Sequence, residues 1–136
     1  MADPVSELRN EVYATMNAYA PLRALAQVYD EVPQGLAESR LPYVSLGPSI
    51  YTIEQIDCIE GGEIMLQVDA WSNDPGQSQI AILAGLVRDS LKGFFPILTD
   101  NALVEFTHER TDFLRDGAIK HASIRFMAIV EETSAS

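Results

Sequence analysis

Residues 63–93, EIMLQVDAWSNDPGQSQIAILAGLVRDSLKG, decide the fold of this chain. Apolar and polar side chains alternate over the first nine positions, which predicts a strand with one buried face. That face carries Ile64, Leu66, Val68 and Ala70. The turn-forming residues 72–76, SNDPG, end the strand, and from Gln77 the apolar residues recur at helical spacing as far as Gly93.

The predicted helix is apolar over a wide arc. Ile82 and Leu86 extend its stripe beyond the side that a single sheet would cover. We therefore expect a second surface to cover it, such as a neighbouring subunit.

The sequence before this segment predicts a helix, a short strand and a loop. Asp3 and Pro4 are a good N-cap and first residue for a helix, with Glu7 on its solvent side. Pro21 either kinks this helix or starts a short second one. Residues 28–32 predict a short strand and residues 34–41 a loop.

Three further strands and two turns are expected. Residues 42–59 read as a strand with a bulge at Gly47–Pro48, joined by a hairpin turn at residues 60–63, EGGE, to the next strand. Residues 94–98, FFPIL, are an apolar connector that must pack. Residues 102–113 and 118–131 form two strands joined by a turn at 115–117, RDG. Val104 and Phe106 are expected on the apolar face of the first of these.

We therefore predict an α+β fold, a mainly antiparallel sheet with two helices packed on one face. Residues 1–136 form one domain, of which 133–136 are a short polar tail.

Charge restricts the possible partners. The 136 residues carry a net charge of −11, with nine basic and twenty acidic side chains, which argues against direct binding to nucleic acid. An acidic surface does suit a protein that lets nucleic acid pass without holding it. No apolar run is long enough to span a bilayer, so we expect no membrane association.

Few residues are candidates for chemistry. His108 and His121, with Glu109 nearby, are the conceivable metal ligands, but their inferred faces differ and no zinc-binding spacing is present. Cys58, beside Asp57, could be a nucleophile, yet no adjacent base is evident, and a structural thiol is the better interpretation.

Carboxylates on strands give a further possibility. Two of them could meet across the sheet as an acid/base pair, although solvated faces or salt bridges fit an acidic chain better. They are Asp69, Glu105, Glu109 and Asp112. Trp71 could stack on a ligand, but more often such a residue anchors a subunit contact. We expect no catalytic, cofactor-binding or metal-binding residues, no cofactor and no enzymatic activity.

Several short stretches together resemble a known family. They are residues 42–47, PYVSLG; 69–72, DAWS, followed by Gly76 and the apolar helix; and 115–117, RDG, with His121 and the last strand, 126–131. In this order they resemble the tail-completion, or tail-terminator, family of long-tailed phages and gene transfer agents.

The resemblance implies a structural virion protein that forms a ring, usually hexameric, on the end of the tail tube and joins it to the head. It implies as partners further copies of this chain, the tail tube protein and a head-side connector or stopper protein, with DNA passing through the channel. It implies a place at the head–tail junction of the virion, after assembly in the host cytoplasm. Two alternatives stay open, a head-side connector or stopper subunit and a small acidic ligand-binding or enzymatic domain with Trp71, Asp69 and Glu105 in its pocket.

Overall fold

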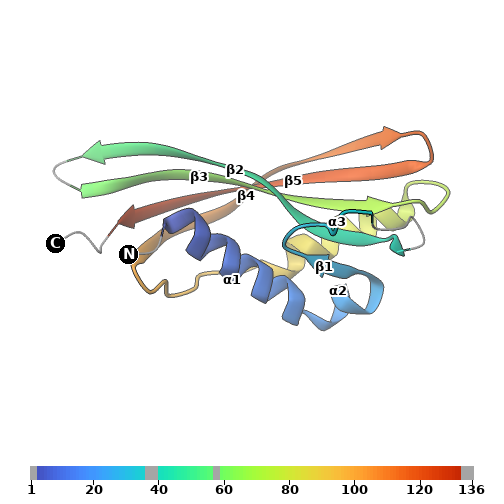
Figure 1. The fold of residues 1–136 in the computed structure, drawn as a ribbon, viewed down its shortest axis with the longest axis horizontal. Coiled ribbons are helices and arrows are strands. Elements are labelled where there is room, and N and C mark those ends of the chain that lie inside the picture. Colours follow the sequence, from blue (N-terminus) through green and yellow to red (C-terminus); the bar gives the residue numbers. More distant parts are fainter. Residues whose placement is uncertain (1–2, 36–39, 57–58, 133–136) are drawn as a thin grey trace.

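A computed structural model describes residues 3–35, 40–56 and 59–132 as three helices and a five-stranded sheet (Figure 1). In chain order the elements are α1 (Pro4–Ala18), α2 (Ala20–Leu25), β1 (Gln27–Tyr29), β2 (Tyr43–Ile56), β3 (Ile59–Ser72), α3 (Ser78–Ser90), β4 (Asn101–Asp116) and β5 (Ile119–Glu132). The strand order is β1-β2-β3-β5-β4, with β1 parallel to β2 and every other pair antiparallel. The predicted α+β class is confirmed. None of the helices in the described ranges has both the length and the apolar character needed to cross a membrane.

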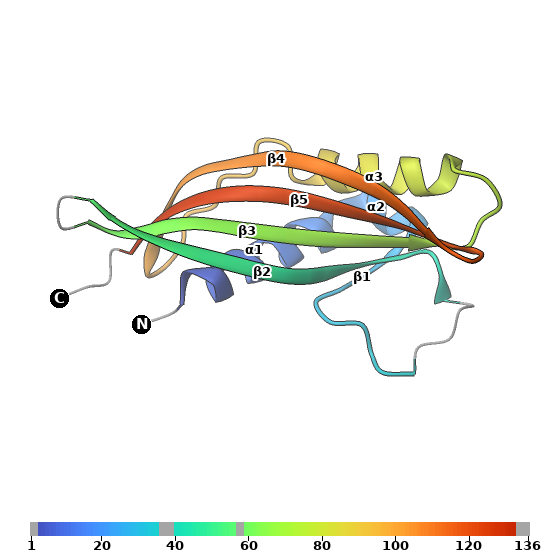
Figure 2. The same ribbon diagram turned by 90° about the horizontal axis from the view of Figure 1, so that it is seen from above.

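The helices lie on one face of the sheet, and no described helix covers the other face (Figures 1 and 2). The core is the layer between them. It joins the predicted apolar faces of β3 and β5 to the buried sides of α1 and α3, whose buried residues include Leu8, Val12, Met16, Ile80, Leu83 and Val87. Ile82 on α3 stays exposed, as the wide apolar arc of this helix predicts for an isolated subunit.

The helix ends follow from local chemistry. The Asp3 side chain caps α1 by accepting a hydrogen bond of 2.8 Å from the main-chain N–H of Val5. Tyr19 is extended, so α1 ends before Pro21, and Pro21 lies in the first turn of α2. Of the two interpretations of Pro21, the separate short helix is the observed one.

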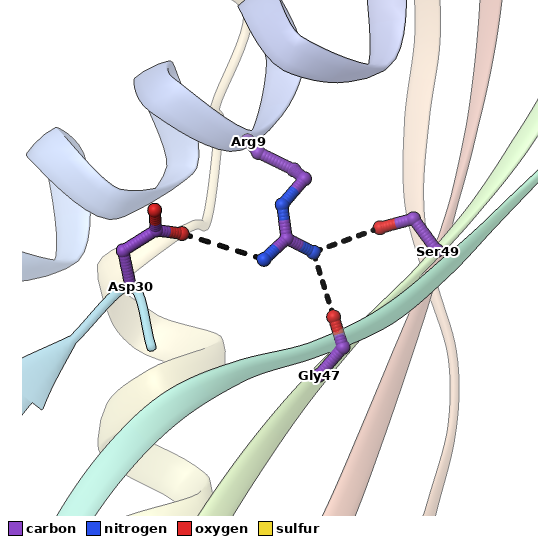
Figure 3. A network of polar contacts seen from close by, with 4 residues as sticks. All are labelled: Arg9, Asp30, Gly47 and Ser49. Atoms are coloured by element: carbon purple, nitrogen blue, oxygen red, sulfur yellow. Dashed lines mark hydrogen bonds and ion pairs between the residues drawn. The ribbon is translucent and has the colours of Figure 1, made fainter. Parts of the chain in front are cut away.

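The predicted bulge in β2 is present and is held by an arginine. The pairing of β2 with β3 shifts register between Leu46 and Ser49. From α1, Arg9 donates to the carbonyl oxygen of Gly47 over 2.6 Å and to Oγ of Ser49 over 3.1 Å, and it also contacts Asp30 (Figure 3). The bulge thus fixes how α1 lies across the edge of the sheet.

The predicted hairpin turn at residues 60–63 is wrong. Gly61 and Gly62 lie inside β3 and pair with β2 on one side and β5 on the other. A Cβ at Gly61 would meet the carbonyl oxygen of Val130, and one at Gly62 would meet that of Thr52. These glycines permit the close approach of three strands. In a sequence, glycines with this role look the same as glycines that form a turn. The antiparallel pairing of β2 with β3 is as predicted.

Three predictions of packing are corrected. Val104 is not on the apolar face, because β4 bulges between Leu103 and Glu105 and this leaves Leu103 buried and Val104 exposed. In the connector Leu98 is buried, but Phe95 and Ile97 point to solvent. Glu7 does not simply face solvent, since its carboxylate binds the end of this connector.

Candidate assembly surface

A hydrogen-bonded polar group of the open sheet face is built on β3 and β5. Asp69 and His121 lie on this face, and Nε2 of His121 donates to Oδ1 of Asp69 over 2.7 Å. Gln67 Nε2 donates to the same oxygen over 2.8 Å. Asp69 is buried, and these two donors satisfy its Oδ1 in place of water.

Aromatic rings continue this group toward β1. Trp71 stacks on the His121 ring, with centroids 3.9 Å apart and planes 7° apart. Tyr43 lies 6.5 Å from Trp71, and Tyr29 packs edge-on against Tyr43 at 5.8 Å. Nε1 of Trp71 is buried, with no hydrogen-bond partner among the described residues. In this chain Trp71 packs against His121 and Tyr43, on a strand in the interior of the sheet.

The two histidines do not form a site together. His108 pairs with Phe126, whose side chain is on the helix-covered face, whereas His121 is on the open face, so the expected difference of faces is observed. His108 bonds to Thr111 over 2.8 Å, and burial, followed by the nearby charge of Arg88, lowers the pKa of its ring. No group of three or more metal-ligating side chains occurs within the described ranges, and Cys58 and Asp57 lie outside them.

The strand carboxylates do not converge either. Asp69 and Asp112 both lie beside Ser123 of β5, but on opposite sides of it, which separates them by two strand spacings, about 10 Å. Asp112 is paired with Arg110 at 2.9 Å, and Glu105 and Glu109 are exposed. These four carboxylates therefore form no acid/base pair with one another.

Two hollows of the described part of the chain lie away from Trp71 and Asp69. One, of about 250 Å³, lies at the C-terminal end of α3, beside Arg88, Lys92 and His108. Another lies beside Arg9 and Asp30. Trp71, Asp69 and Glu105, which the ligand-binding alternative would place together in one pocket, line neither of these two hollows.

Charge is distributed unevenly along the strands. The end of the sheet formed by residues 49–56, 59–66, 101–107 and 127–132 carries only acidic charged side chains. They are Glu54, Glu60, Glu63, Glu105, Glu131 and Glu132. Here the Tyr51 hydroxyl donates to Oε2 of Glu132 over 2.9 Å, and burial together with this carboxylate raises the pKa of Tyr51 to about 12.

Exposed apolar side chains flank the same end of the sheet, and sequence reasoning did not identify them as a surface. Ile53 on β2 is 68% exposed and Val104 on β4 is 48% exposed. Ile97, in the connector that leads into β4, is 97% exposed. The signal in the sequence was weak, because isolated apolar residues on a surface are common. The shape, charge and apolar edges of this molecule favour assembly over catalysis.

Comparisons with known proteins agree with this. A sequence model of the family described as Tail completion protein gp17 matches residues 10–131. A chain in the structure of the virion of a native gene transfer agent particle has a TM-score of 0.85 and 27% identity, over 96% of this chain and 99% of that one. The gp17 protein of bacteriophage SPP1 has a TM-score of 0.60 and 17% identity, over 96% and 93%, and shows likeness of fold alone. The search of curated protein sequences gives no match.

Proposed function

This chain belongs to the tail completion protein gp17 family, and we propose that it forms a ring that ends the tail tube and joins the tube to the head. As a member of this family it is a structural protein and not an enzyme. The family match covers residues 10–131, so it takes in every strand and helix of the described fold, with α1 included from Asn10 onward and β5 as far as Glu131.

The observation that carries the proposal is the similarity to a chain of the gene transfer agent virion. That chain and this one align over almost their full lengths at 27% identity. The surfaces described above support the same conclusion, because exposed apolar edges and an open sheet face are features of a subunit that acts in an assembly.

Tail length control follows from occupancy of a surface. A ring bound to the last layer of the tube covers the positions where the next tube subunits would dock, so the tube stops growing. The opposite face of the ring is then available to a head-side connector. The partners are copies of this chain, the tail tube protein and a head-side protein, and the ring lies at the junction of head and tail in the virion.

The acidic character suits the channel of such a ring. DNA that leaves the head must pass through the junction without being held there. Carboxylates repel phosphates, so an acidic wall keeps the passing DNA mobile. The acidic end of the sheet, which has no basic residue in its described segments, is the surface best suited to line that channel.

Deletion of the gene in the producing particle tests the proposal. We expect tails of uncontrolled length that are not joined to heads, with both properties restored when the protein is supplied from a plasmid. Tails of uniform normal length that fail to join heads would indicate a head-side connector. Normal tails joined to heads would overturn the proposal.

A further inference from the structure

We propose that neighbouring copies in the ring meet edge to edge, with the free part of β2 of one copy against the start of β4 of the next. This inference rests on the proposed ring and names the surface that forms it. It depends on the stretches of the two edge strands that no described strand covers, and on the apolar residues exposed there. It also depends on the height of these residues along the strands and on the direction of the strands.

The two edges of the sheet are open over matching stretches. β1 pairs with β2 only at Tyr43–Ser45, so no described strand covers the outer side of β2 from Ser49 onward. β4 is the strand at the other edge, and its outer side has no strand partner within the described ranges. Open strand edges are templates for pairing with another chain, and soluble proteins normally block them.

Apolar residues are exposed on both open stretches. Ile53 is on the free part of β2, and Val104 is placed on the surface by the bulge at the start of β4. Ile97 is close in sequence to the start of β4 and widens the apolar surface there. Contact between copies would remove these side chains from water, which is favourable in proportion to their apolar area.

The position of the two exposed patches along the strands favours a second copy of this chain as the binding partner. The pairing runs across the sheet from Ile53 to Gly62, then to Val130 and to Leu103, the residue next to Val104. Ile53 and Val104 therefore lie at the same height along the strands, on opposite edges. A neighbour can then be reached by rotation with little translation along the strands, and such an operation closes a ring instead of building a filament.

Strand direction agrees with this arrangement. β2, β3, β5 and β4 alternate in direction, so β4 runs opposite to β2 within one copy. Rotation about an axis along the strands keeps their direction. β4 of one copy would therefore lie antiparallel to β2 of the next, in the orientation that forms regular main-chain hydrogen bonds.

Cysteine cross-linking in rings assembled on the tail tube protein tests the contact. In a Cys58→Ser background, one protein carries Ile53→Cys and a second carries Val104→Cys. Mixed and treated with a short bis-maleimide, they should give cross-linked dimers, whereas each alone should give none because a head-to-tail contact does not bring identical residues together. The chain that carries both substitutions should give a ladder up to the ring's copy number.

Leu114→Cys in place of Val104→Cys is the matched control. Leu114 is 53% exposed on the same strand, but it is level with His121, Trp71 and Tyr43, where β1 covers β2. It should not cross-link to Ile53→Cys. Two results would overturn this contact and leave the proposed function intact. One is the formation of rings on tube ends without an Ile53–Val104 cross-link, and the other is cross-linking of the Ile53→Cys protein to itself. Absence of rings in electron micrographs of the same samples would overturn both.

Discussion

Arg9 Nη1 on α1 donates a 2.6 Å hydrogen bond to the carbonyl oxygen of Gly47, at the point where β2 and β3 lose their register. A bulge interrupts the regular ladder of a strand pair. The arginine also binds Ser49 beyond the bulge, so one side chain ties the first helix to both sides of the irregularity (Figure 3). The edge strand that we assign to the ring contact begins at this position.

Arg9→Met should therefore destabilise the fold. It keeps much of the aliphatic stem but removes the hydrogen bonds to Gly47 and Ser49, at a cost of about 1–3 kcal/mol for partly buried bonds to a charged group. Urea unfolding followed by circular dichroism measures the loss. Arg115→Met, at the exposed tip of the last hairpin, is the control and should change stability by less than about 0.5 kcal/mol. Equal stability of the two variants would show that the hydrogen bonds of Arg9 make no net contribution to the free energy of unfolding.

Glu7 holds the connector that leads into β4. Its carboxylate accepts hydrogen bonds from the main-chain N–H of Thr99 at 2.8 Å and from Nδ2 of Asn101 at 2.7 Å. We expect Glu7→Ala to speed hydrogen exchange at residues 99 and 100 and to lower stability by about 1–3 kcal/mol. Glu11→Ala, on the same helix, should leave both unchanged. Unaltered exchange in Glu7→Ala would contradict the anchoring role.

Gly62→Ala should be strongly destabilising. The added Cβ would be placed against the carbonyl oxygen of Thr52, so β2 and β3 would have to separate, at a cost of about 1–3 kcal/mol or more. Gly85→Ala makes the same chemical change in α3, where nothing lies within 4 Å, and should raise stability by about 0.5–1 kcal/mol. Thermal unfolding of the two variants should give shifts of opposite sign.

Stability should fall at high pH because of Tyr51. Its pKa is raised to about 12, so the folded state holds this proton more tightly than the unfolded state, where a tyrosine titrates near its ordinary value of about 10. The contribution is complete below the unfolded pKa and is lost as pH rises from about 10 through 12. Tyr51→Phe should show a smaller decline over this range than the wild type. Identical pH profiles would contradict the prediction.

Much of the fold was accessible from local patterns. The faces of β3 and β5, the cap at Asp3, the bulge at Gly47–Pro48 and the last hairpin each depend on residues close together in the chain. The turn of that hairpin is at residues 117–118, because Arg115 and Asp116 of the predicted turn still pair with Lys120 and Ile119. The errors occurred where distant strands decide the outcome. Gly61 and Gly62 are typical of a turn in sequence, but in the fold they lie between β2 and β5 and pair with both. The alternation of apolar residues predicts a buried Val104, but the bulge in β4 interrupts that alternation and leaves Val104 exposed.

The candidate surface was less accessible than the fold. Sequence reasoning placed Trp71 and Asp69 on one strand but left His121 apart from them, and only the register of β3 against β5 brings His121 into contact with both. The edge residues Ile53 and Val104 are 51 positions apart in the numbering, and nothing local to either indicates that they share a level on opposite edges. That relation appears only once all four antiparallel strands are in register.

Negative-stain imaging of the purified protein, alone and mixed with the cognate tail tube protein, tests whether this chain forms a ring that ends the tail tube. We predict closed rings that cap the ends of tubes and stop their elongation when added during polymerisation. The same sample without this protein should give tubes of uncontrolled length. Tubes that elongate equally with and without it, and that carry no cap at either end, would show that this protein does not terminate the tube.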